Sequence, residues 1–529
     1  MNRVAGTVGA VIVVAGVAWV GTAWYTGTKV EEELRASIDK TNQQLSTAVP
    51  EAGITVALAS FDRSIFSSHA RYSVTFTVPP EEGQPTQSSA PKQVFISDKI
   101  EHGPLPLSRL KTGHFGPAMA TSNFELERND VVEPWFKATQ DKTPLYGQAS
   151  LKYGGDVDGV LNLAPATYAD EQTNVEFTGF EMDFDVEKKT GASKANGEMD
   201  RFMLKSVSEG EPFLAELKML KFDGDMRSTI AGQHSMTIDQ ISLGTPEAPV
   251  IIDKYVQRLQ ADEADGKSSG TISYDVGQVK QGESVLATSA QFIVKVANFD
   301  TTAAKALGDI YTEAANRASA AGEASPAFTP EESKRLSDAA MQLLAANPSV
   351  AVDPFLITTP KGEARFNLAV DLTKPTDMAV GLDQLVVQTI NKLDARVAVD
   401  KPLFAGYLAD AMVGEGAPRA QAEAQALQQA DMAAGMAAQM GVARMEGERL
   451  VSSLNYAGGT VDFNGQKMPV DEFAAMVVGL VFAGGGMMPD MADDDGATMT
   501  EPETSEPADE LDDEVAPGEG AAATPVPQR

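Results

Sequence analysis

An uninterrupted apolar segment near the amino terminus constrains this chain most. Val4–Tyr25 contains no charged residue and would form a helix of about 33 Å, close to the roughly 30 Å hydrocarbon core of a bilayer. Trp19, Trp24 and Tyr25 lie toward its far end, where aromatic side chains favour the membrane interface. We therefore expect a retained transmembrane anchor, preceded by a cytoplasmic stub at residues 1–3, with the lipid bilayer as a partner.

A cleaved signal peptide is the alternative interpretation of this segment. Gly21 and Ala23 could supply the small residues that precede a cleavage site, and Arg3 a minimal positive start. The apolar run is longer than the roughly 7–15 residues usual for a signal peptide, which favours an anchor. With Arg3 before the span, the bulk of the chain is expected on the far side of the membrane.

Composition restricts what the bulk of the chain can do. The sequence has 75 acidic residues against 42 basic residues, a net charge of −33, so most of its surface would repel nucleic acid. It has no cysteine, which excludes disulfides, thiol chemistry and thiolate-bound metals. The length predicts more than one domain.

Alternating patterns predict an α+β fold with long antiparallel sheets. Residues 26–300 read as a β-rich domain, as in Ala70–Val78, where apolar and polar side chains alternate. One helix, Ala248–Gln260, is expected to interrupt these strands. Residues 301–486 are expected to form a mixed α+β domain that makes the C-terminal half helix-rich, and 487–529 form an acidic, disordered tail. The helices expected in the mixed domain are Thr301–Ser319, Pro330–Ala346, Gly381–Leu393 and Ala417–Gly441.

An internal similarity suggests a duplicated helix–hairpin module. In each copy a predicted helix precedes a predicted hairpin, and the hairpin residues align without a gap. A chance likeness between two amphipathic hairpins is the alternative. The matching positions include Val56, Phe61, Ala70 and Tyr72, which align with Val350, Phe355, Ala364 and Phe366.

No motif in the sequence indicates catalysis or a bound cofactor. The chain has four histidines, none at metal-ligand spacing, and it lacks a phosphate-binding loop and a nucleophile elbow. Met432, Met436 and Met440 recur at helical spacing and could bind copper(I), but packing on a helix face is the simpler interpretation. We therefore expect a protein that is not an enzyme, with no cofactor and no metal.

Several motifs together resemble the YdgA-like proteins of Gram-negative bacteria. They are Val17–Glu31, Phe61–Ser68, Ile100–Leu107 and Leu454–Met468. The resemblance implies a protein of the cell inner membrane with its body in the periplasm, and it implies no established activity and no catalytic residues. The motif residues His102, Gly103, Pro104, Asn464 and Gly465 are interpreted as structural turns rather than as a ligand site.

Two functions remain open from the sequence. Extended sheets could bind lipid or another apolar ligand in the cell envelope, if they form an open groove rather than a filled core. Alternatively, the protein could be an envelope scaffold or assembly factor that binds other proteins. The oligomeric state is not indicated.

Overall fold

The computed structural model describes residues 38–39, 41–42, 45, 53–64, 67–76, 91–102, 105–111, 113, 115–208, 210–228, 230–321, 325–377, 380 and 382–484. The chain divides into two compact units, Met1–Val470 and Asp471–Arg529. The second unit contains nearly all of helix α10 (Val470–Gly484). The other described elements belong to the first unit.

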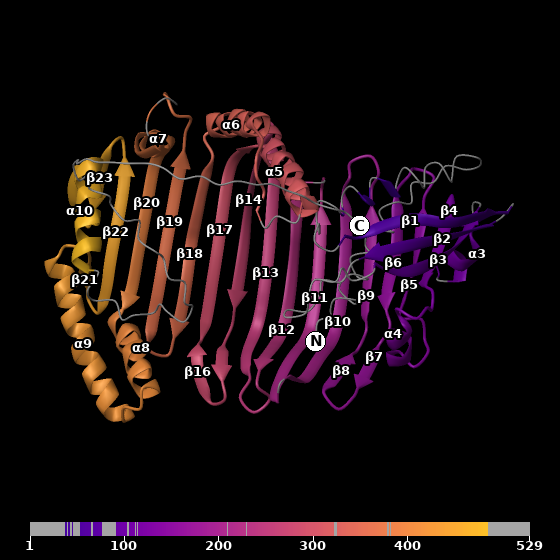
Figure 1. Cartoon of the computed structure of the whole chain (residues 1–529), viewed down its shortest axis with the longest axis horizontal. Coiled ribbons are helices and arrows are strands. Elements are labelled where there is room, and N and C mark those ends of the chain that lie inside the picture. The colour runs from indigo at the N-terminus through magenta and orange to yellow at the C-terminus, as the bar shows by residue number, and fades with distance from the viewer. Residues whose placement is uncertain are drawn as a thin grey trace, which may run out of the picture. The chain divides into compact units, whose positions relative to one another are not determined.

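The first unit is built on one 24-stranded sheet in which every pairing between strands is antiparallel (Figure 1). Most strands pair with the next strand along the chain, and β7–β8, β15–β16 and β21 are short side branches. The strands are β1 (Thr55–Arg63), β2 (Ser67–Phe76), β3 (Lys92–His102), β4 (Ala120–Leu126), β5 (Leu145–Leu151), β6 (Val157–Leu163), β7 (Ala166–Ala169), β8 (Thr173–Phe177), β9 (Phe180–Val186), β10 (Ser193–Ser208), β11 (Glu211–Met226), β12 (Gly232–Gly244), β13 (Val250–Ala264), β14 (Lys267–Val276), β15 (Val279–Gln281), β16 (Ser284–Ala287), β17 (Ser289–Asp300), β18 (Ser349–Thr359), β19 (Gly362–Leu372), β20 (Ile390–Asp400), β21 (Arg444–Glu446), β22 (Arg449–Ala457), β23 (Thr460–Phe463) and β24 (Gln466–Pro469).

Helices interrupt the sheet at a few connections and lie mainly along the ends of the strands from β13 to β22 (Figure 1). The Thr329 hydroxyl caps α6 at the Glu332 amide, and the Glu332 carboxylate accepts from the Thr329 amide in return. The helices of the first unit are α3 (Leu107–Lys111), α4 (Glu133–Ala138), α5 (Thr301–Ala321), α6 (Pro330–Ala345), α7 (Leu382–Thr389), α8 (Lys401–Gly414) and α9 (Arg419–Gln439).

Pairing registers give the sheet two continuous faces. Side chains of directly opposed residues lie on the same face of an antiparallel pair, so a face can be followed from strand to strand. We call face A the face that carries the register-linked row listed next, and face B the opposite one. The row runs Phe61, Ala70, Asp98, Phe124, Gly147, Leu161, Met182, Gly197, Phe222, Met236, Gln257, Tyr274, Phe292, Phe355, Phe366, Val397 and Ser452.

Face A packs into a filled core at the amino end of the sheet. Val94, Ile100 and Leu145 from β3 and β5 are buried there, and Leu45 and Phe136 of α4 pack against them. This cluster covers β1–β6 and is the main apolar core among the described residues. At its amino end the β region is therefore a filled core rather than an open groove.

The prediction that the C-terminal half is helix-rich is wrong. The structure is mostly one large antiparallel sheet, with 53% strand against 25% helix, and β17 pairs directly with β18 across the α5–α6 insertion. The helix expected at Ala248–Gln260 is instead β13, because that segment pairs with β12 on one side and β14 on the other. Helix α8 was not predicted, whereas α5, α6 and α9 confirm the expected helices.

The expectation of a single-pass inner-membrane protein must also be corrected. Val4–Tyr25, with Trp19, Trp24 and Tyr25, lies outside the described residues. Within the described part of the chain, no helix is both long and apolar enough to cross a bilayer: α5 and α9 reach 21 residues but carry charges, and α10 has 15 residues. The described part of the chain therefore gives no support to the expected transmembrane anchor, inner-membrane location and periplasmic body.

The predicted duplication is not reflected in strand pairing. Phe61 pairs with Ala70 in the β1–β2 hairpin. The equivalent residue Phe355 pairs with Phe366 in the β18–β19 hairpin, two positions away from the expected partner Ala364. The two hairpins therefore differ in register, as expected for a chance likeness.

A buried carboxyl in the core makes stability depend on pH. The Tyr72 hydroxyl donates to Oδ2 of Asp98 over 3.3 Å, and the Ser122 hydroxyl donates to Oδ1 over 2.7 Å. Burial raises the pKa of Asp98 to about 6, in spite of these hydrogen bonds. The pKa of Tyr72 is also raised, mainly by burial and then by the neighbouring Asp98 charge.

We predict that Asp98→Asn removes a loss of stability at neutral pH. The folded-state pKa lies above the unfolded value near 4, so the folded chain binds the proton more tightly, and the free energy of unfolding falls as the pH rises from about 4 to 6. In urea titrations across this window, the free energy of unfolding of Asp98→Asn should rise relative to that of wild type by up to about 3 kcal/mol. Asp183→Asn, at an exposed strand position, is the control. A variant curve parallel to wild type would refute this assignment.

Aromatic rings cover several glycines on face A. The Phe184 ring lies over Gly159, where an added Cβ would collide with that ring and with the Gln148 carbonyl oxygen. We expect Gly159→Ala to lower the free energy of unfolding by about 1–3 kcal/mol. Gly224→Ala is the matched control, because its Cβ would lie 3.4 Å from the Phe222 ring, an ordinary contact. Equal effects in chemical denaturation would contradict the collision.

Candidate functional site

The strands β14, β17, β18, β19, β20 and β22 present four apolar rows on face A, which we call the apolar patch. Each row contains directly opposed residues from the six strands, and none carries a charged residue. The first two rows are Gly270, Val296, Val350, Val370, Leu393 and Tyr456, and Ile272, Val294, Val352, Leu368, Ala395 and Leu454. The other two are Tyr274, Phe292, Phe355, Phe366, Val397 and Ser452, and Val276, Ala290, Ile357, Ala364, Val399 and Leu450.

The apolar patch remains accessible to solvent, unlike the core at the amino end. On β14 and β17–β20, every side chain of the patch is at least partly exposed, and Phe355 and Val397 are 41% and 43% exposed. The exception lies at the edge, where Tyr456 is buried and its hydroxyl donates to the Val387 carbonyl of α7 over 3.2 Å. Among the described residues, no second layer buries the patch on these strands.

Aromatic side chains form the middle of the patch. The Tyr274 and Phe292 rings stack with centroids 6.1 Å apart, and Phe355 meets Phe292 edge-on at 5.9 Å. These cross-strand contacts hold the rings in place along the third row. The patch is therefore an ordered surface rather than a set of free side chains.

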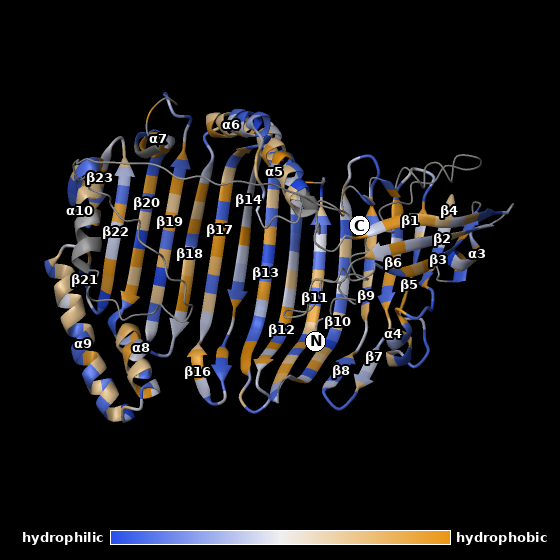
Figure 2. Cartoon of the chain, viewed as in Figure 1, coloured by the Kyte–Doolittle hydropathy of each residue, from blue (hydrophilic) through white to orange (hydrophobic). Residues whose placement is uncertain are grey.

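Face B of the same strands is mainly polar, so hydropathy broadly alternates along the strands (Figure 2). The Asn367 amide donates to Oδ1 of Asp353 over 2.6 Å, and Lys295 lies 3.1 Å from the other oxygen of that carboxylate. Face B also has a hollow of about 570 Å³, which is lined in part by Arg396, Arg444 and Asp394. The polar surface meets water and leaves face A as the apolar side.

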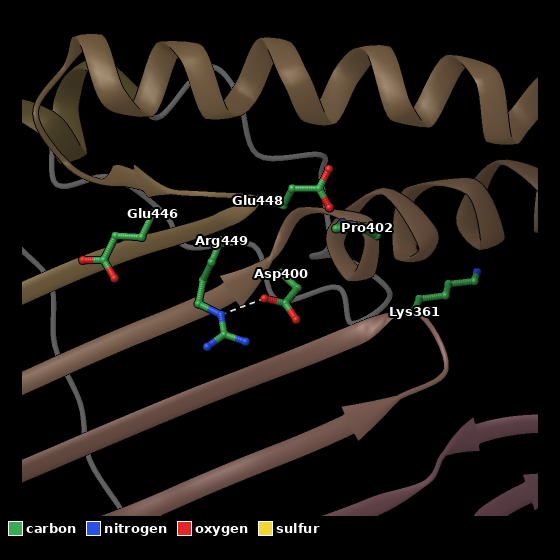
Figure 3. Close-up of a pocket in the computed structure, with 6 residues that line it drawn as sticks. All are labelled: Lys361, Asp400, Pro402, Glu446, Glu448 and Arg449. Carbon is green, nitrogen blue, oxygen red and sulfur yellow. Dashed lines mark hydrogen bonds and ion pairs between the residues drawn. The ribbon is translucent and has the colours of Figure 1, made fainter.

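A smaller polar cleft of about 400 Å³ lies where β20 meets α8 (Figure 3). The Arg449 guanidinium points at Asp400, with 2.7 Å between Nε and Oδ1, while Lys361 extends away from this pair. This hydrogen bond, more than any other cause, lowers the pKa of Asp400. Glu446 and Glu448 complete the lining, so the cleft is suited to charge pairing rather than to an apolar ligand.

A polar row bounds the apolar surface of face A on β10–β13. Arg201, Lys218, Gln240 and Asp253 oppose one another there, and the Lys218 ammonium and the Gln240 amide each donate along the row over 2.9 Å. The next positions, Met219 and Lys254, have φ of 52° and 57°, which a regular strand does not adopt.

Beyond this row the apolar side chains change face. Leu220 and Ile238 lie on face A, whereas Leu217 and Ile241 oppose each other on face B. The alternation shifts by one residue in each of these strands, and a shift of one residue moves an apolar set to the opposite face. The polar row therefore marks the place where the apolar surface of face A ends.

Of the motif residues from the sequence, His102 lies far from the apolar patch in the topology, whereas Asn464 and Gly465 lie next to β22, the edge strand of the patch. His102 ends β3, where its Nε2 is hydrogen-bonded to the Ser68 hydroxyl at 2.9 Å, and burial followed by the Arg63 charge lowers its pKa. Gly103 and Pro104 lie outside the described residues. Asn464 and Gly465 connect β23 to β24, and their φ values of 53° and 90° fit a type I′ turn.

Asn464 also ties two parts of the chain together. Its amide donates to the Gly441 carbonyl over 2.9 Å, and its side-chain oxygen accepts from the Ser453 amide over 2.8 Å. These contacts join the segment after α9 to β22. Nothing in them requires a ligand, and the interpretation as a structural turn stays a prediction.

The described residues contain no group of three or more histidine, cysteine, aspartate or glutamate side chains placed to hold a metal ion. Met432 and Met436 of α9 and Met440, which caps its end, are exposed, so the expected packing of these methionines on a helix face is not seen between α8 and α9. Ala422 and Ala426 make that contact instead. The methionine row remains a solvent-facing surface.

Sequence reasoning did not identify the apolar patch as one site. The alternation that makes each strand two-sided is visible, as in Phe366, Leu368 and Val370. The pairing registers that bring six such strands onto one face were not predicted. A comparison of the phase of alternation between successive strands would have been the available signal.

Three proteins similar to this chain have names that state no activity. Protein YdgA of Escherichia coli K12 is 26% identical over 499 residues, covering 90% of this chain and 97% of that protein. The uncharacterized protein YihF of the same organism is 24% identical over 480 residues, covering 88% of this chain and 96% of that protein. An uncharacterized protein of Haemophilus influenzae is 28% identical over 169 residues, covering 32% and 44%. No solved structure matches the chain.

The family assignment agrees with these relatives. A model of a bacterial protein family of unknown function, DUF945, matches residues 1–471. The resemblance to YdgA-like proteins inferred from the sequence motifs is confirmed. This chain belongs to the DUF945 family.

Proposed function

We propose that the protein binds an elongated apolar molecule, such as the acyl chain of a lipid, on the apolar patch and catalyses no reaction on it. The observation that carries the proposal is the partly exposed state of the patch on β14 and β17–β20. Contiguous apolar surfaces larger than a few hundred Å² are uncommon on soluble proteins and mark binding surfaces.

The dimensions of the patch suit a chain-like ligand. Six strands at about 4.8 Å spacing and four rows at about 6.8 Å spacing give a surface of roughly 29 Å by 27 Å. Burial of each methylene group contributes about 0.8 kcal/mol, so an acyl chain that lies along a row gains affinity with its length. The rows carry no charge that such a chain would desolvate.

The alternative function, a scaffold that binds other proteins, has less specific support. Protein interfaces combine an apolar centre with a polar rim. On the neighbouring strand β13, Ala261 and Leu259 oppose the first two rows of the patch, so that side of the patch has no continuous polar rim. We therefore favour the apolar ligand and treat protein binding as an outcome of the test.

The test compares adjacent residues on opposite faces of β18. Val352 lies in the second row of the patch, and Ala351 lies on face B opposite Lys295. With the fluorescent fatty acid cis-parinaric acid as probe, we expect Val352→Asp to weaken binding at least about tenfold, a loss of about 1.4 kcal/mol. Ala351→Asp introduces the same charge and should bind as wild type does.

A second variant protects the test against misfolding. Val397→Asp changes a more exposed side chain of the patch and should weaken binding in the same way. Circular dichroism and thermal unfolding of each variant report whether the fold is kept. Wild-type binding by both folded variants, or no binding of fatty acid by any of the proteins, would contradict the proposal, and the second result would favour a scaffold.

A further inference from the structure

We infer that two ligand-free copies of this chain pack their apolar patches against each other, so that self-association and ligand binding exclude each other. The exclusion rests on the proposed function, because it requires the ligand to occupy the same patch. The interface itself rests on the size and composition of the patch alone.

The area of the patch matches what a stable dimer needs. Its roughly 29 Å by 27 Å correspond to about 800 Å² of sheet surface. A standard protein interface buries about 800 Å² on each partner. One patch facing a second copy of itself would therefore supply a complete two-fold interface without other surfaces.

The composition of the patch also fits the centre of an interface between copies. Such centres are depleted in charged residues and enriched in aromatic ones. No row of the patch carries a charged residue, and Phe292, Phe355 and Phe366 lie side by side in the third row. Two sheets packed face to face interdigitate such side chains at a spacing of about 10 Å.

Charge outside the patch opposes and limits this contact. Each copy has a net charge of −33, so two copies repel each other over long distances, and salt screens that repulsion. The polar row at Arg201 and Lys218 would be desolvated if the interface extended over β10–β13. The contact should therefore not extend over the part of β10–β13 that carries this row, and it should strengthen, not weaken, with added salt.

The experiment is sedimentation velocity on the full chain after bound lipid has been stripped. Wild type should form a dimer at micromolar concentration, and the dimer fraction should rise with salt. Phe355→Asp places a charge on the most exposed ring of the patch and should shift the dimer dissociation constant at least about tenfold. Leu356→Asp, the next residue, lies on face B opposite Arg365 and should leave the dimer unchanged.

Addition of cis-parinaric acid separates the two proposals. A wild-type dimer that becomes monomeric as the fatty acid saturates it supports the inference. A monomeric ligand-free wild type that still binds the fatty acid through Val352 overturns the inference and leaves the proposed function standing. A dimer that persists in Phe355→Asp and Val397→Asp, both shown to be folded, also overturns it.

Two further results would overturn the claim that dimerisation and ligand binding exclude each other. If the dimer depends on Phe355 but no fatty acid binds, the proposed function fails and only the interface remains. If the fatty acid binds and the dimer stays intact, the two events use different surfaces and the exclusion is wrong.

Discussion

Register between neighbouring strands is the constraint on which the rest of this structure depends. Each strand is two-sided because its side chains alternate, but alternation alone does not make a surface. The antiparallel pairings keep the phase of alternation aligned from β14 to β22, so Ile272, Val294, Val352 and Leu368 meet in one row. A slip of one residue in any strand would place its apolar set on face B.

The same face serves two purposes along the chain. At the amino end, face A packs with Leu45 and with Phe136 of α4 in one cluster, and its side chains are buried. From β14 to β20 the helices lie along the ends of the strands (Figure 1), and the side chains of the patch are at least partly exposed. On the strands β10–β13 the polar row through Lys218 ends the apolar surface of face A, and beyond that row the apolar side chains lie on face B. A filled core and an open surface thus coexist on one sheet.

Much of the β architecture could be predicted from local sequence, but its continuity could not. Alternation of apolar and polar residues in segments such as Ala364–Val370 predicted strands, and the cap and proline at Thr329-Pro330 predicted the start of α6. The segment Ala248–Gln260 was expected to be a helix, and Ile252, Val256 and Leu259 do recur at helical spacing. The positive φ of Lys254 breaks the alternation there, and only pairing with β12 and β14 makes the segment a strand. Pairing of β17 with β18 across two helices is a contact distant in sequence, which no local pattern contains.

The candidate site depends on such distant contacts, which explains why sequence reasoning found the turn residues and missed the patch. Asn464-Gly465 is a two-residue signal that can be recognised locally. The patch, by contrast, needs six correct registers. The apolar segment Val4–Tyr25 drew attention to a membrane, whereas the feature that the structure describes is an apolar surface on the sheet.

The most direct test of the account measures whether face A is open on these strands. The chain has no cysteine, so single cysteines can be placed at Leu368 on face A, at Asn367 on face B and at Ile100 in the core, and their reaction with a small thiol reagent can be timed. In lipid-stripped protein diluted to nanomolar concentration, the account predicts that Leu368→Cys reacts nearly as fast as Asn367→Cys, while Ile100→Cys stays protected. Protection of Leu368→Cys to the same degree as Ile100→Cys would show that this chain covers the patch itself and would contradict the account.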